Sequence, residues 1–149
     1  ADLIEAAFAN ASPHQFLGRS MKVAKEEIIG LLTALEIFVN EDEEAENERY
    51  RQMCHQVVDA LIEVPGLNIT VEHDELDYLI PEAVIEFTRG WKGPSVNQVL
   101  DALAKGNPPI YLQSFGNPNE PAVNPVNLSE RELDILIRRL REELTKASL

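Results

Sequence analysis

The spacing of apolar side chains predicts helices at the beginning of this chain. In residues 1–12, the apolar positions share one face of a 3.6-residue period. Residues 23–40 carry a wider apolar stripe. It is formed by Ile28, Leu31, Leu32, Leu35, Phe38 and Val39 and is broadened by Ile29 and Ile37. A helix with so little polar surface is expected to be covered on most of its sides.

Helical spacing returns three times in the remainder of the chain. An amphipathic helix begins in the acidic run 41–48, whose carboxylates complement the dipole of a helix start. A short helix follows Ser95, which forms a capping-box pattern with Gln98, and a closing helix follows Ser129, which forms the same pattern with Glu132.

Strands are predicted between these helices. Residues 69–73 alternate between apolar and polar positions, and a second strand is predicted at 83–88. Pro108-Pro109 forces an extended entry into a third strand over 110–114, and the loop after it leaves room for a short fourth strand around 122–126. The order is a helical N-terminal segment followed by ββαββα. This order predicts an α+β fold with a mainly antiparallel sheet covered by helices.

Composition narrows the possible partners and the compartment. The 149 residues are 44% hydrophobic, enough for one compact domain, and their formal charge of −13 disfavours nucleic acid and anionic membranes as partners. The single cysteine, Cys54, allows no intrachain disulfide, which fits a reducing, cytoplasmic setting. No apolar run is long enough to cross a membrane. The chain does not begin with Met and opens on helical sequence, so we expect a fragment of a longer protein.

A basic cluster stands out against this acidic background. Arg19, Lys22 and Lys25 lie before and within the first turn of the apolar helix, where the helix dipole is already positive. Such a cluster suits a phosphate or carboxylate, because Arg and Lys add charge to unpaired backbone N–H groups. The alternative is that Glu26, Glu27 or other carboxylates neutralise these cations.

The histidines and the cysteine give weaker signals. His14 precedes the basic cluster and is a candidate to stack on or hydrogen-bond a ligand held there, although a histidine in a loop is often only solvent-exposed. No two histidines have the spacing of zinc ligands. Cys54 lies on an apolar helix face and is interpreted as a core residue. The sequence contains no phosphate-binding glycine loop and no self-contained catalytic set.

Two motifs that lie apart in the sequence resemble motifs of a known enzyme family. The run 2–34, which includes GRSMKVAKEEIIGLLTA, resembles the segment that links the two domains in the selenocysteine synthase family of pyridoxal-phosphate (PLP) enzymes, including relatives of D-glucosaminate-6-phosphate ammonia-lyase type. GNPPIY at 106–111 is similar to the family's G-D-P-P-I-Y, and ELDILIRRLREEL is similar to its closing helix. Two positions depart from the family pattern: Ser20 replaces the usual Pro, and Ala24 replaces the usual Gly.

The resemblance implies the C-terminal small domain of a fold-type I PLP enzyme, with residues 1–22 as an interdomain segment and 23–149 as one α+β domain. The PLP lysine would lie upstream, in the large domain of the same polypeptide, so the isolated chain is expected to be inactive and to bind no cofactor. By position, Arg19 and Lys22 become candidates for the phosphate or carboxylate of a small anionic substrate, and Lys25 is a weaker candidate. The implied chemistry is β-elimination or replacement, in a homodimer or larger oligomer.

Two other interpretations stay open. One is selenocysteine synthase acting on seryl-tRNA, against which the charge of −13 and the lysine at position 22 both weigh. The other is a free-standing acidic α+β interaction domain without catalysis.

Overall fold

A computed structural model describes residues 1–12, 14–20, 23–114, 117 and 119–146, apart from the side chain of Arg19. The chain forms two compact units, Ala1–Asp42 and Glu43–Leu149, and each is described by itself. The division into an interdomain segment 1–22 and a domain 23–149 stays a prediction.

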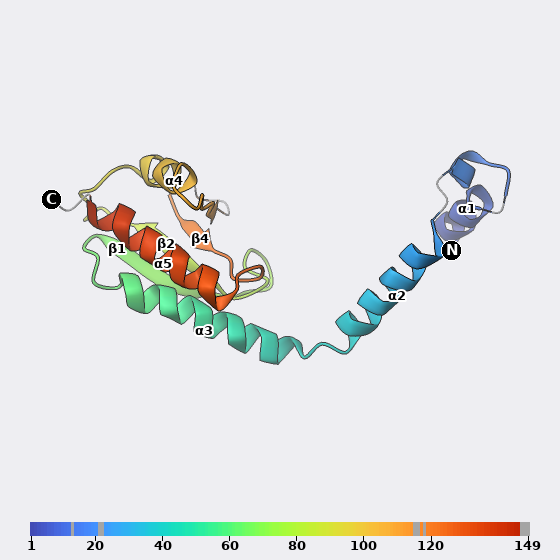
Figure 1. Ribbon diagram of the computed structural model, residues 1–149, viewed down its shortest axis with the longest axis horizontal. Coiled ribbons are helices and arrows are strands. Elements are labelled where there is room, and N and C mark those ends of the chain that lie inside the picture. Colours follow the sequence, from blue (N-terminus) through green and yellow to red (C-terminus); the bar gives the residue numbers. More distant parts are fainter. Residues whose placement is uncertain (13, 21–22, 115–116, 118, 147–149) are drawn as a thin grey trace. The chain divides into compact units, whose positions relative to one another are not determined.

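The first unit is helical, as its apolar spacing predicted. It contains α1 (Asp2–Asn10), the 3-10 helix η1 (Leu17–Ser20) and α2 (Lys25–Val39), which are labelled or coloured blue in Figure 1. No residue of α1 or α2 is buried in the chain. Even Leu35, on the apolar stripe of α2, is 48% exposed. The helix expected at 23–40 is therefore present, and within the first unit its apolar surface is not covered.

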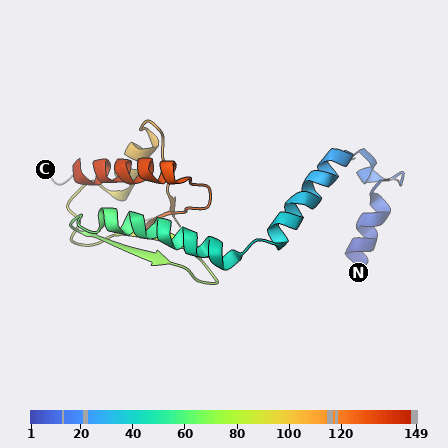
Figure 2. The ribbon, with the colours of Figure 1, turned by 60° about the horizontal axis from the view of Figure 1, so that its bottom comes forward.

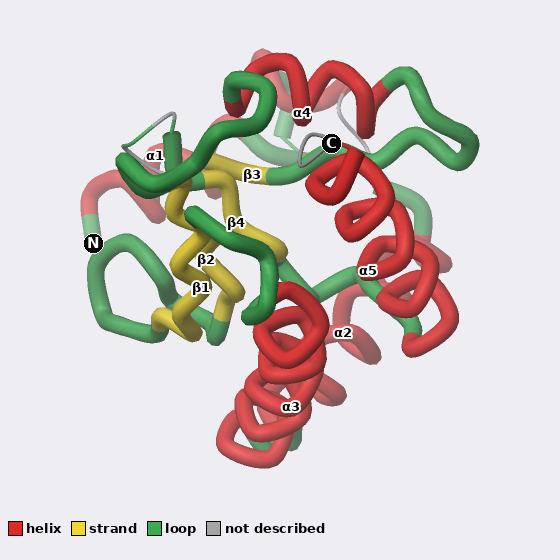
Figure 3. The backbone as a smooth tube through the Cα atoms, turned by 90° about the vertical axis from the view of Figure 1, so that its left-hand side faces the viewer, coloured by secondary structure: helices red, strands yellow, loops and turns green. Residues whose placement is uncertain are grey.

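The second unit is a helix-covered antiparallel sheet. Its elements are α3 (Glu43–Leu61), β1 (Leu67–Glu72), β2 (Glu82–Phe87), α4 (Val96–Ala104), β3 (Gln113–Ser114), β4 (Pro121–Val123) and α5 (Glu130–Thr145). The strand order is β1-β2-β4-β3, and every pairing is antiparallel. Figures 2 and 3 show α3 and α5 together on one face of this sheet, and α4 packs against α5. The predicted α+β class and the order ββαββα are confirmed.

Residues on β2 and β4 show which sheet face is covered. Ala83, Ile85 and Val123 belong to the hydrophobic core beneath the helices, whereas their neighbours Val84 and Ala122 do not. Successive side chains in a strand point to opposite faces, so Val84 and Ala122 lie on the other face of the sheet. The core is completed by Val64, which follows α3, and by helical residues, namely Met53, Cys54, Val57, Leu61, Val99, Leu103, Leu133, Leu136, Leu140 and Leu144.

The two predicted capping boxes begin α4 and α5. Ser95 Oγ accepts from the backbone N–H of Gln98 at 3.4 Å, and the Ser95 backbone N–H donates to Gln98 Oε1 at 2.9 Å. Ser129 and Glu132 exchange the equivalent bonds at 3.4 and 2.9 Å. Each box satisfies backbone donors that a helix start otherwise leaves unpaired. None of the helices in the described part of the chain combines the length and hydrophobicity needed to span a bilayer.

Candidate anion-binding segment

His14 lies in the turn between α1 and η1. Its ring meets the ring of Phe8 edge-on, with centroids 5.2 Å apart and an interplanar angle of 74°. Its backbone N–H donates to the carbonyl of Ala11 at 3.0 Å, which fixes the turn. Its Nε2 atom is buried and has no hydrogen-bond partner among the described atoms. This histidine is therefore half-buried against an aromatic ring, rather than fully exposed as the alternative interpretation held.

A close backbone contact holds η1 against the end of α1. A Cβ atom built on Gly18 would lie 2.5 Å from the carbonyl oxygen of Asn10, so only glycine permits this approach. Asn10 in turn donates from its side chain to the Ala6 carbonyl at 2.9 Å, inside α1. Since Arg19 follows Gly18 directly, the contact also fixes where the backbone of Arg19 runs. The side chain of Arg19 and the whole of Lys22 lie outside the described residues.

The start of α2 already carries a carboxylate from its own first turn. Glu27 Oε2 accepts from the backbone N–H of Ala24 at 2.7 Å, and Glu26 and Glu27 both complement the helix dipole. Lys25, the first residue of α2, is exposed and makes no ion pair within the described part of the chain. Glu27 therefore accepts a hydrogen bond from the backbone at the start of α2 and forms no ion pair with Lys25. The ammonium group of Lys25 can thus bind an anionic ligand.

The described geometry brings together part of the predicted set. His14 and the backbone of Arg19 belong to one short α1–η1 hairpin, and Lys25 begins the next helix. Binding of an anion by Arg19, Lys22, Lys25 and His14 stays a prediction, because two of these side chains are not described.

The cysteine outside this segment is part of the folded core and does not form a reactive site. Cys54 is fully buried and its thiol donates to the Pro81 carbonyl at 3.4 Å; burial, with the nearby charge of Glu82, raises its pKa to about 12. A thiol with this pKa is not a nucleophile at neutral pH.

His73 lies within 3.5 Å of Arg51, which pairs with carboxylates of its own helix. In the described part of the chain, no three His, Cys, Asp or Glu side chains are grouped so as to hold a metal ion.

The described lysines do not suit the role of a PLP lysine. Lys25, Lys92, Lys105 and Lys146 are all exposed, whereas a lysine that forms a Schiff base is usually desolvated so that its pKa falls. No step of PLP chemistry is therefore assigned to them.

One buried acid was not singled out from the sequence. Glu82 begins β2, is 2% exposed, and accepts a hydrogen bond from Asn124 Nδ2 at 2.8 Å. Burial raises its carboxyl pKa, and the Asn124 bond opposes the shift. Its partner residue lies 42 positions away, so only the strand pairing brings the two together. The sequence does indicate which sheet face Glu82 lies on. Glu82 directly precedes the inward-facing Ala83, and successive residues in a strand point to opposite faces.

Comparison with known proteins relates the chain to two enzymes. Over 144 residues, or 96% of the chain, it is 28% identical to 5'-C-glycyluridine monooxygenase-decarboxylase from a Streptomyces species, of which the match covers 35%. Over 130 residues, or 87% of the chain, it is 25% identical to D-glucosaminate-6-phosphate ammonia lyase from Salmonella typhimurium, of which the match covers 34%. No model of a known protein family matches.

A solved structure gives the same relationship in three dimensions. The structure of D-glucosaminate-6-phosphate ammonia-lyase matches 91% of this chain with a TM-score of 0.69 and 25% sequence identity, and the match covers 36% of that protein. The chain thus spans about a third of the length of the relatives it matches. It is similar in sequence and in fold to a domain-sized part of D-glucosaminate-6-phosphate ammonia-lyase, which confirms the predicted resemblance to this group of PLP enzymes.

Proposed function

We propose that this chain is the C-terminal domain of a PLP-dependent lyase or transferase that acts on a small anionic amino compound. The observation that carries the proposal is the match to D-glucosaminate-6-phosphate ammonia-lyase, which extends over 91% of the chain at a TM-score of 0.69. The substrate named for that relative contains an amine, a carboxylate and a phosphate. An active site for such a compound needs cationic groups, and the α1–η1–α2 segment of this chain carries three of them.

The chain's own contribution would be to bind and orient the anionic part of the substrate. Arg19 offers a planar fork of N–H donors and Lys22 a mobile point charge, both suited to phosphate or carboxylate. His14 Nε2, which is buried beside Phe8 and has no hydrogen-bond partner among the described residues, is a third candidate contact. PLP, when bound, supplies an electron sink for the carbon that carries the amine. The lysine that holds it would come from the large domain, outside this chain.

The apolar surface of α2 supports an association with that large domain. Leu31 is 62% exposed, Leu32 57% and Phe38 71%. Exposed apolar surface of this extent is typical of an interface. Under the proposal it is covered by the large domain of the same polypeptide or by a second subunit of a homodimer or larger oligomer.

The first test is made on the longest natural polypeptide that contains this sequence. Arg19→Ala and Lys22→Ala should each weaken binding of an anionic substrate by about 1.5–3 kcal/mol, the usual contribution of a charge-assisted hydrogen bond. The measurement is kcat/KM with the phosphorylated substrate and with its unphosphorylated analogue. A loss with the phosphorylated substrate alone assigns the residues to the phosphate, and a loss with both assigns them to the carboxylate. Lys105→Ala is the matched control, since Lys105 is exposed and pairs with Asp101 at 3.2 Å in the second unit.

Two results would contradict the proposal. Unchanged kinetics in both variants would remove Arg19 and Lys22 from the site. A natural reading frame that begins near Ala1, with no PLP-binding domain upstream, would rule out the enzyme and leave an interaction domain.

A second candidate reaction is favoured by one observation. The match at 28% identity over 96% of the chain is to a monooxygenase-decarboxylase that acts on 5'-C-glycyluridine, according to its name. An oxygenase of this kind would consume O₂ and release CO₂, whereas an ammonia-lyase would release ammonia without O₂. Assays of O₂ uptake and ammonia release under air and under nitrogen distinguish the two reactions.

A further inference from the structure

The strand β1 forms one edge of the sheet, because the order β1-β2-β4-β3 gives it a single neighbour, β2 (Figure 3). One hydrogen bond of that pair joins the Thr88 N–H to the Gly66 carbonyl at 3.0 Å. Hydrogen-bonded and non-hydrogen-bonded pairs alternate along an antiparallel ladder. Every second residue from Gly66 to Glu72 therefore directs its backbone N–H and C=O to β2, and the residues between them direct theirs to the open edge.

The outward-directed groups belong to Leu67, Ile69 and Val71. The Leu67 N–H donates to the Val64 carbonyl at 3.4 Å, which agrees with an outward direction. The N–H groups of Ile69 and Val71 and the carbonyls of all three residues make no hydrogen bond within the described part of the chain. An extended segment laid along β1 would thus meet two free donors and three free acceptors.

The length and composition of β1 leave this edge open to pairing. Natural sheets usually protect an edge strand by shortening it, covering it, or placing proline or lysine in it. β1 is six residues long and contains no proline, lysine or arginine. The opposite edge, β3, has only two residues. β1 is therefore the edge that offers a template for a whole added strand.

The charges around β1 indicate the chemistry of the added strand. On the outer sheet face, opposite α3 and α5, β1 borders a hollow that contains the carboxylates of Glu72, Glu86 and Glu120 and no basic residue. Glu72, on β1 itself, forms no ion pair with another described side chain. The stretch 63–86 holds seven Asp and Glu and no Lys or Arg. An added strand with basic side chains on this face would meet opposite charge, whereas a second copy of β1 would add carboxylates.

The helix-covered face of the same edge is apolar. The side chains of Ile69 and Val71 pack against the hydrophobic core on this face. Arg51 of α3 lies 3.5 Å from His73, just after β1, so this side of α3 runs beside the edge. Ile62 follows Arg51 by three helical turns on the same side and is 66% exposed. Apolar side chains of an added strand would therefore contact Ile62.

We propose that β1 binds an extended segment of another polypeptide in which Lys or Arg alternates with Val or Ile, and that this segment pairs as an added antiparallel strand. Successive side chains of a strand point to opposite faces. The basic residues would therefore lie on the acidic outer face, and the apolar residues would lie beside Ile69 and Ile62. Backbone hydrogen bonds supply affinity in this mode, and the alternating side chains supply specificity. The site belongs to the second unit and does not depend on the proposed enzymatic function.

The test uses the 149-residue chain and the peptide acetyl-KVKVKVK-amide, followed by NMR and hydrogen exchange of the backbone amides. Before the peptide is added, the amide hydrogens of Ile69 and Val71 should exchange faster than that of Thr70, which is bonded to β2. Saturable binding should slow exchange at Ile69 and Val71 by about tenfold or more, because both N–H groups gain an acceptor. The peptide acetyl-EVEVEVE-amide, with the same pattern and the opposite charge, should not bind.

A charge variant of β1 tests the specificity. Glu72→Gln should weaken binding of the basic peptide roughly threefold, since it removes the carboxylate nearest to the added strand. Asp134→Asn removes an exposed acid of α5 and is the matched control for total charge, so it should leave binding unchanged. The amide spectrum checks the folding of each variant, and the exchange measurement on the wild-type chain decides the proposal if a variant does not fold.

Several results would overturn the proposal. Absence of saturable binding, or equal binding of the acidic peptide, would show that the edge does not select a basic strand. Binding that leaves exchange at Ile69 and Val71 unchanged, or that weakens equally in Asp134→Asn, would assign it to diffuse charge. Protection of both amides that rises with protein concentration in the absence of peptide, together with a dimer in sedimentation, would assign the edge to a second copy of the chain.

Discussion

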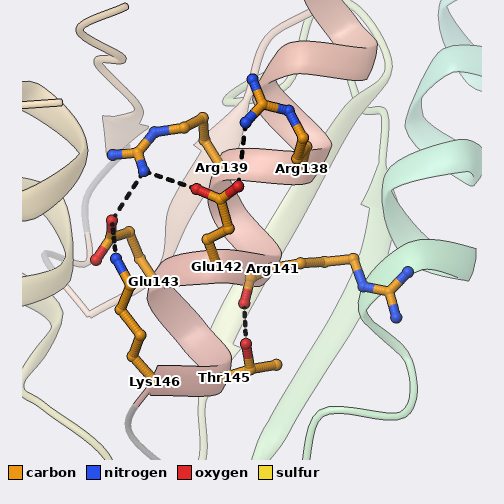
Figure 4. Close-up of polar contacts among 7 residues, drawn as sticks. All are labelled: Arg138, Arg139, Arg141, Glu142, Glu143, Thr145 and Lys146. Atoms are coloured by element: carbon orange, nitrogen blue, oxygen red, sulfur yellow. Dashed lines mark hydrogen bonds and ion pairs between the residues drawn. The ribbon is translucent and has the colours of Figure 1, made fainter. Parts of the chain in front are cut away.

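Gly106→Ala tests whether a single close contact joins the loop after α4 to α5. A Cβ atom at this position would lie 2.2 Å from Arg139 Nη2, 3.0 Å from Cζ and 3.2 Å from Nε. The guanidinium cannot easily move away, because the Arg139 side chain is only 11% exposed and pairs with Glu142 at 2.9 Å and Glu143 at 3.0 Å (Figure 4). Glycine at position 106 thus leaves room for the guanidinium of Arg139.

The magnitude follows from two opposing contributions. Forcing a methyl group into a packed site costs about 1–3 kcal/mol. Replacing glycine by alanine also restricts the unfolded chain, which stabilises the fold by about 0.4–1 kcal/mol. The free energy of unfolding of Gly106→Ala should therefore be lower than that of the wild type by roughly 0.5–2 kcal/mol. The measurement is urea unfolding of the 149-residue chain, followed by circular dichroism.

A double-mutant cycle with Arg139→Ala isolates the contact. In the Arg139→Ala background the clash is absent, so Gly106→Ala should be neutral or stabilising by up to about 1 kcal/mol. Gly90→Ala is the matched control, because its nearest neighbour would be Thr88 Oγ1 at an ordinary 3.4 Å. If Gly106→Ala destabilises equally in both backgrounds, the contact with Arg139 is not the cause and the reasoning is refuted.

Three further predictions concern the second unit. Ser129→Ala should lower the free energy of unfolding by about 0.5–2 kcal/mol, since it removes the cap of α5; an unchanged urea midpoint would contradict this. Cys54, with a pKa of about 12, should react with a thiol reagent at pH 8 far more slowly in the folded chain than in urea, and equal rates would show that the thiol is accessible. Because the pKa of Glu82 is raised, the folded state keeps its proton at a pH where the unfolded state has lost it. Stability should therefore fall as pH rises above about 4.5, and Glu82→Gln should flatten that fall in urea titrations at several pH values.

The periodicity of the sequence predicted most of the fold because helix and strand signals here agree with the packing. Where the predicted and the observed elements differ, contacts between segments distant in the sequence are the cause. Residues 110–112 were expected to belong to the third strand, but β3 contains only Gln113 and Ser114. Ile110 and Leu112 instead pack against the hydrophobic core without joining the ladder. The backbone N–H of Ile110 donates to the carbonyl of Leu103 at 3.1 Å, which ties the start of this segment to the end of α4 instead of to a neighbouring strand.

The two candidate sites were unequally visible in the sequence. The cations of the α1–η1–α2 segment lie within seven residues of one another, so a local reading finds them. An acidic hollow on the outer sheet face is lined by Glu72, Glu86 and Glu120, which are brought together only by the order β1-β2-β4. No local pattern contains that information, since the facing of Glu72 and Glu82 depends on the register across a nine-residue connection.

The exposure of α2 and the position of the predicted anion site have one physical explanation under the proposed function. Within the first unit, Leu31, Leu32 and Phe38 of α2 lack the burial that normally stabilises an amphipathic helix. If the large domain covers this surface, the helix becomes anchored. Arg19 and Lys22 lie within six residues of the first residue of α2, so anchoring the helix would hold their charges in place before substrate arrives. Ordering the site in advance lowers the entropic cost of binding, and the apolar stripe of α2 would in this way contribute to substrate affinity without touching the substrate.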